Sequence, residues 1–179
     1  MLTHLRILAL FALSFVAVCA APPLVDFDGV KYVLASVELS KDGTVTNEYV
    51  PEGESIDSWT TLLGVRHWPK VKKVEKATEA WVAMVRSLLV RDAVSYVADG
   101  KKNDIVLEAW LSAPDKSYIE ANLHRFVLED GTVGVKAYQF AEKIRMSGGK
   151  GDPSRFLDHR NARFVDLGKL KLELYREKK

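Results

Sequence analysis

The spacing of hydrophobic residues limits the possible folds more than any other feature of this sequence. Apolar side chains occupy every second position in residues 31–39, which is typical of a strand with one buried face. The turn residues Lys41, Asp42 and Gly43 follow and predict a hairpin. The other predicted strands are residues 44–50, 59–68, 105–111, 118–128 and 132–141. The short turns between several of these segments favour a sheet that is mainly antiparallel.

The spacing becomes helical in residues 72–90. The apolar residues that share one helical face there are Val74, Ala77, Trp81, Met84, Val85 and Leu88. A second helix is predicted over residues 152–172, because Asp152 is a favourable N-cap and Pro153 suits the first helical position. The sequence therefore predicts the α+β class, with a mostly antiparallel sheet of six to seven strands, a long central helix and a C-terminal helix packed on the sheet.

Residues 1–20 have the pattern of a secretory signal peptide. Arg6 precedes an apolar run that only Ser14 interrupts, and the segment holds no acidic residue. The run is shorter than the ~20 apolar residues that cross a bilayer. We expect cleavage after Ala20, so that residues 21–179 form a single secreted domain, located in the periplasm, with no transmembrane segment.

The single cysteine of the chain, Cys19, lies within this predicted signal peptide. A lipidated cysteine would follow a small residue, and Val18 precedes Cys19. We therefore expect Cys19 to leave with the signal peptide, with lipidation of Cys19 as the open alternative. Residues 21–179 would then contain no disulfide and no cysteine that binds zinc.

Charge and motifs exclude several classes of function. The 26 basic and 24 acidic residues give a net charge of +2, too small to predict a nucleic-acid partner. The remaining histidines of the domain, His67, His124 and His159, lack the spacing of metal ligands, so we expect no metal. The sequence has no G-x-S-x-G motif and no phosphate-binding glycine loop of the G-x-x-x-x-G-K-[ST] type. We expect no cofactor and assign no catalytic residue.

The run Asn47-Glu48-Tyr49-Val50-Pro51-Glu52-Gly53-Glu54, with Trp59-Thr60 shortly after it, resembles a signature of small secreted proteins from Gram-negative bacteria. These proteins have no assigned activity. The order of the predicted elements resembles that of the PsbP-like sandwich fold, which includes photosystem accessory proteins. The resemblance implies an accessory or binding role rather than catalysis.

The signature also contains one compact group of polar and aromatic residues. We predict a binding site formed by Glu48, Tyr49, Glu54, Asp57 and Trp59. The alternative is a structural turn in which Trp59 anchors the segment in the sheet. The sequence thus predicts an accessory or protein-binding domain with a partner in the cell envelope. A small-molecule or lipid-binding protein is the alternative, a hydrolase comes third, and the oligomeric state stays open.

Overall fold

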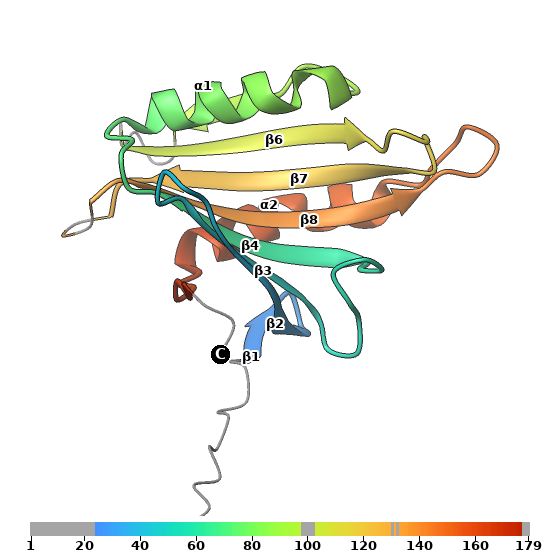
Figure 1. Cartoon of the computed structure of the whole chain (residues 1–179). Coiled ribbons are helices and arrows are strands. Elements are labelled where there is room, and N and C mark those ends of the chain that lie inside the picture. Colours follow the sequence, from blue (N-terminus) through green and yellow to red (C-terminus); the bar gives the residue numbers. More distant parts are fainter. Residues whose placement is uncertain (1–23, 98–102, 130, 132, 177–179) are drawn as a thin grey trace, which may run out of the picture.

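The computed structural model describes residues 24–97, 103–129, 131 and 133–176. These residues form one antiparallel sheet of eight strands (Figure 1). The strands are β1 (Leu24–Phe27), β2 (Val30–Leu39), β3 (Val45–Pro51), β4 (Thr61–Trp68), β5 (Val94–Val97), β6 (Asp104–Ser112), β7 (Tyr118–Val127) and β8 (Val135–Arg145).

The strand order is β1-β2-β3-β4-β8-β7-β6-β5. Two four-stranded meanders, β1–β4 and β5–β8, therefore join through the antiparallel pair β4 and β8. This central ladder extends from Thr61 opposite Glu142 to Trp68 opposite Val135. It brings residues from the two halves of the chain onto common faces of the sheet.

Two α-helices, α1 (Val74–Val85) and α2 (Ser154–Lys169), cover opposite faces of the sheet. In Figure 1, α1 lies above β6 and α2 passes behind β7 and β8. Consecutive side chains of a strand point to opposite faces. In β7, Leu123 packs in the core on the α2 side, while the His124 ring lies 4.2 Å from the Trp81 ring of α1. Both faces of this part of the sheet are thus buried.

The α1 core confirms most of the helical face expected from the sequence. Val74, Ala77, Trp81 and Val85 are buried against the sheet. Met84, however, is 62% exposed, and the expectation that it is buried is wrong. Leu88 is also exposed, because α1 ends at Val85 and a 3₁₀ turn, η1 (Arg86–Leu88), changes the direction of the following side chains.

The prediction of an α+β fold with a long central helix is wrong. The strands contain more than twice as many residues as the two α-helices, so the protein is mostly β. The expected helix over residues 72–90 contains an α-helix of only 12 residues. The chain then turns, and Leu89 forms a β-bridge to Leu111, so backbone pairing replaces further helix. This fold gives no support to the PsbP-like resemblance.

The sheet has more strands than the six to seven expected, because the sequence analysis missed β1 and β5. Each has only 4 residues, too few for alternation to be recognised. None of the helices in the described ranges is long and apolar enough to cross a membrane. The predicted signal peptide, its cleavage site near Ala20 and Cys19 lie outside the described residues.

Candidate functional site

The signature on β3 divides between the two faces of the sheet. Asn47 and Tyr49 point to the α2 side, where residues 170–176 cross the sheet after α2. The Asn47 amide donates to the Tyr175 carbonyl at 2.8 Å and accepts from the Tyr175 N–H at 2.7 Å. The Tyr49 hydroxyl donates to the Glu173 carbonyl at 3.2 Å. Both side chains are buried, so they hold the C-terminal segment in place.

Of the other predicted site residues, Glu54 stabilises the turn before β4. Its carboxylate accepts from the Thr60 N–H at 2.6 Å and from the Thr60 hydroxyl at 2.7 Å. Asp57 is exposed and forms no hydrogen bond or ion pair with another described residue. Trp59 lies beside β8, with its ring centroid 3.8 Å from Lys143 Nζ. The structure thus places Trp59 beside Lys143. It directs Glu48 to the face of the sheet opposite Tyr49.

These neighbours define a group that we call the Lys143 patch: Glu48, Trp59, Tyr118, Glu120 and Lys143. All five are half-buried. The ammonium group of Lys143 contacts two aromatic rings, because the Tyr118 ring centroid is 4.9 Å from Nζ. Glu120 lies opposite Lys143 in the ladder between β7 and β8. The patch lies outside the area covered by α1, which packs on β6 and part of β7.

Burial shifts the pKa of each charged group in the patch. Burial raises the pKa of Glu120, a side-chain hydrogen bond with Asn122 and the Lys143 charge partly oppose the shift, and the Glu48 carboxylate adds to it. Burial also raises the pKa of Glu48, with Glu38 adding to the shift and Arg66 opposing it, and burial lowers the pKa of Lys143. Glu48 lies at the edge of the patch, because β4 and β8 lie between its strand and β7. In the part of the chain that the structure describes, no ion pair involves Glu48, Glu120 or Lys143.

The charged side chains under α2 are, in contrast, directly paired. Arg163 donates to Glu142 at 2.8 Å and to Asp28 at 2.8 Å. Glu108 accepts from the Trp110 indole and forms ion pairs with Arg91 and Arg160. Paired charges of this kind have a structural explanation, because each partner compensates for the lost hydration of the other. In the Lys143 patch the only such compensation among the described residues is the contact of Lys143 with the Trp59 and Tyr118 rings, and neither Glu48 nor Glu120 has an ion-pair partner there.

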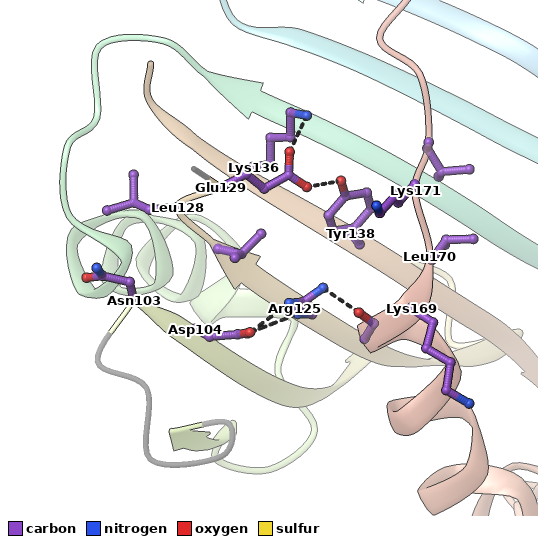
Figure 2. A pocket seen from close by; sticks show the side chains of 13 residues that line it. Asn103, Asp104, Arg125, Leu128, Glu129, Lys136, Tyr138, Lys169, Leu170 and Lys171 are labelled. Carbon is purple, nitrogen blue, oxygen red and sulfur yellow. Dashed lines mark hydrogen bonds and ion pairs between the residues drawn. The ribbon is translucent and has the colours of Figure 1, made fainter. Parts of the chain in front are cut away.

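A second candidate region is a cleft of about 800 Å³ on the α2 side, which we call the β6–β8 cleft. Its walls are the neighbouring ends of β6, β7 and β8, the last turn of α2 and the residues that follow α2 (Figure 2). Arg125 donates to both oxygens of Asp104, and its Nη1 donates to the Gly168 carbonyl at 2.8 Å. The hydrogen bond to Asp104 raises the pKa of Arg125, which stays charged.

A second network lines the same cleft. Lys136 donates to Glu129 at 2.6 Å, and the Tyr138 hydroxyl donates to the other oxygen of Glu129. Burial favours a higher pKa for Glu129, but the hydrogen bonds from Lys136 and Tyr138 outweigh it and lower the pKa. Burial raises the pKa of Tyr138, so the phenol remains a proton donor. Both networks therefore hold their side chains in fixed positions around the cleft.

The three histidines among the described residues lie apart. His124 is buried between Trp81 and Phe126, and burial lowers its pKa to about 3. His67 Nε2 bonds the Val133 carbonyl at 2.7 Å, and His159 lies 3.6 Å from Asp28. Among the residues that can be described, no group of three or more His, Cys, Asp or Glu side chains could hold a metal ion.

Sequence reasoning missed Glu120 and Lys143 in the patch and Asp104 and Arg125 in the cleft. Each pair lies on two neighbouring strands, Glu120 opposite Lys143 and Asp104 close to Arg125. No local motif marks them, because their proximity comes from strand pairing between distant segments. Glu120 and Arg125 share β7 with Asn122 and His124, so neither charged residue stood out within the strand.

Fold and sites together define a mostly-β protein with one antiparallel sheet, a helix on each face and two polar surface regions. The chain belongs to an uncharacterised protein family, whose profile matches residues 19–171. Neither the curated proteins nor the solved structures include a significant match to the sequence.

Proposed function

We propose that this protein is an exported accessory protein of the cell envelope that binds another protein through the Lys143 patch. One observation supports this function most directly: Glu48, Glu120 and Lys143 are half-buried charges without ion pairs among the described residues. Partial burial of an unpaired charge opposes folding. Groups retained at such a cost cluster at functional sites.

The chemistry of the patch suits a protein partner. Tyr and Trp are common at the centres of protein interfaces, because they combine apolar area with a polar group, whereas Lys and Glu are depleted there, so the two rings of the patch carry the argument. Trp59 and Tyr118 both contact the Lys143 ammonium group with their rings. A partner carboxylate or carbonyl could pair with Lys143, while partner donors could pair with Glu48 and Glu120. Each new pair would compensate for hydration that the free protein has already lost.

The patch is tested by capture from the envelope fraction with the mature protein and with Lys143→Met. The expected result is at least one protein that wild type enriches and Lys143→Met does not. Lys150→Met is the matched control, because Lys150 is exposed in a turn and forms no ion pair with a described residue. A photocrosslinking amino acid at position 59 should crosslink to that same protein. Equal capture by all three proteins would reject the patch as the binding surface.

The proposed export has its own test. The apolar run before Ala20 and the cleavage pattern support a mature chain that begins at Ala21. Intact-mass analysis of periplasmic extract should give the mass of residues 21–179. A diacylated chain beginning at Cys19, or a full-length chain in the membrane fraction, would contradict this maturation.

The β6–β8 cleft favours a second function, the binding of a small molecule. Small-molecule sites are usually clefts of roughly 300–1,000 Å³ with a few fixed polar groups. The cleft has about 800 Å³ and two hydrogen-bonded networks on its walls. The two functions use different faces of the sheet, so the protein could carry both.

A further inference from the structure

The β6–β8 cleft is a departure from the close packing of the rest of the protein. Protein interiors leave few spaces larger than a water molecule. Beside the cleft, the apolar core under α2 is filled by large side chains such as Phe156 and Leu167, both fully buried. Ion pairs alone need no free space. The cleft opens to the surface, and its volume of about 800 Å³ between the two networks leaves room for a bound molecule.

The charges that line the cleft have an excess of cations. Four basic and two acidic residues lie on its walls: Arg125, Lys136, Lys169 and Lys171 against Asp104 and Glu129. Asp104 and Glu129 are the ion-pair partners of Arg125 and Lys136. The two remaining lysines determine the net positive charge of the cleft.

The side chains of Lys169 and Lys171 point in different directions. Lys169 forms an ion pair with Asp166 at 3.0 Å, and Figure 2 shows its side chain turned away from the cleft. Figure 2 shows the Lys171 side chain directed toward Tyr138. Within the described residues, Lys171 has no ion-pair partner. Lys171 is exposed, whereas its neighbours Leu170 and Leu172 pack in the core, so Lys171 is the cation available to a ligand at the rim of the cleft.

The C-terminus of α2 also borders the cleft, and a helix C-terminus carries a partial negative charge that would repel an anion. Arg125 reduces this repulsion, because its Nη1 donates to the Gly168 carbonyl in the last turn of α2. The same guanidinium is fixed by Asp104 on the other side. At the end of α2, the Gly168 carbonyl is therefore hydrogen-bonded to the charged Arg125 side chain and is less repulsive to an anion.

The remaining walls are apolar. Val127, Leu128, Leu170 and Leu172 line the cleft. Val127 and Leu172 are already almost fully buried, so the apolar surface that a ligand extending from Lys171 would bury belongs mainly to the half-buried Leu128 and Leu170, and such burial stabilises a complex by roughly 25 cal/mol per Å². A small inorganic anion would leave this area in contact with water.

From these contacts we infer that the β6–β8 cleft binds a small amphiphilic anion, a carboxylate or phosphate joined to an apolar group, with the anionic head at Lys171. This site is separate from the Lys143 patch and does not depend on the proposed protein partner. It lies on the opposite face of the sheet and uses other residues.

The test measures binding of four probes to the mature protein by titration calorimetry, all below their micellar concentrations. The probes are decanoate, decyl phosphate, inorganic phosphate and decyltrimethylammonium. We expect decanoate or decyl phosphate to bind at least about tenfold more tightly than decyltrimethylammonium, since a charged hydrogen bond contributes about 1.5–3 kcal/mol. Inorganic phosphate should bind more weakly than decyl phosphate, because it lacks the apolar group.

Variants locate the site. Lys171→Glu should weaken binding of the anionic probe about tenfold or more, whereas Lys73→Glu, the same charge change on the exposed residue before α1, should leave it unchanged. Leu128→Trp should fill part of the cleft and also weaken binding. Unfolding midpoints of all variants show whether they remain folded. The inference is overturned by equal binding of anionic and cationic probes, by equal effects of Lys171→Glu and Lys73→Glu, or by no binding of either amphiphilic anion.

Discussion

Asn47→Ala should release the C-terminal segment and destabilise the protein by about 1–3 kcal/mol. The Asn47 side chain is fully buried and makes two hydrogen bonds to the backbone of Tyr175, at 2.8 and 2.7 Å. Each such bond contributes about 0.5–1.5 kcal/mol net. The substitution removes both hydrogen bonds, and the Tyr175 N–H and carbonyl then form hydrogen bonds with water instead. The whole loss therefore equals the sum of two ordinary hydrogen bonds.

The assay is urea unfolding combined with hydrogen exchange of residues 170–176. Exchange in this segment should accelerate in Asn47→Ala, while the central ladder of β4 and β8 should keep its protection. Because the bonds use backbone atoms of Tyr175, Tyr175→Ala should reproduce little of the loss. A chain that ends at Leu174 should reproduce most of it.

A double-mutant cycle makes this reasoning refutable. In the chain that ends at Leu174, Asn47 has lost its partner, so adding Asn47→Ala should cost much less than in the full chain. Fully additive losses would show that the effect of Asn47→Ala comes from something other than these two hydrogen bonds. Unchanged exchange in residues 170–176 would lead to the same conclusion.

Three further predictions concern the helix, the buried histidine and the patch. Trp81→Ala should lower the free energy of unfolding by about 3–5 kcal/mol in urea, while Lys73→Ala, at an exposed site, should have almost no effect. Burial lowers the pKa of His124 from 6.5 to about 3, so the unfolded chain binds a proton that the folded protein does not. Stability should therefore fall as pH drops from about 6.5 toward 3, by up to about 1.4 kcal/mol per pH unit, and His124→Phe should reduce this slope when unfolding is measured at pH 7 and pH 5. Burial raises the pKa of Glu120, so its stability contribution is greatest below the unfolded pKa of 4.5 and is lost as pH rises. Glu120→Gln should accordingly raise the unfolding midpoint at pH 7 more than at pH 4, and the opposite order would contradict an unpaired carboxylate in the patch.

The local elements of the fold could be predicted from the sequence. Alternation identified the extent of β2, although its buried residue is Tyr32 and the expected face ends in the exposed Leu39. The N-cap predicted at Asp152 lies one residue before the observed N-cap, Pro153, so the start of α2 was identified within a few residues. Both signals are local, because a strand face and a helix cap depend on neighbouring residues only. The extent of the helix over residues 72–90 could not be predicted this way. The β-bridge between Leu89 and Leu111 takes the place of further helix. It joins two segments that are separate in the sequence, so no local pattern could predict it.

The sites depended still more on distant contacts. Glu48 and Tyr49 are adjacent on β3. Glu120, whose pKa the Glu48 carboxylate raises, lies on β7, and only the order of strands in the sheet brings the two glutamates into one region. The sequence analysis grouped Glu48 and Tyr49 because they are adjacent in the chain. In a strand, adjacent side chains occupy opposite faces, so adjacency in sequence separated them in space. The predicted site of five residues is untested and stays a prediction.

The position of β8 has a consequence for how the chain is made. β8 is the last strand to be synthesised, but it occupies the middle of the sheet between β4 and β7. Until β8 emerges, β4 and β7 each present an unpaired strand edge, and such edges promote aggregation. Contacts between distant segments also slow folding. We therefore expect the chain to depend on being kept unfolded until its C-terminal third is available, and an export route that carries unfolded chains would meet that requirement.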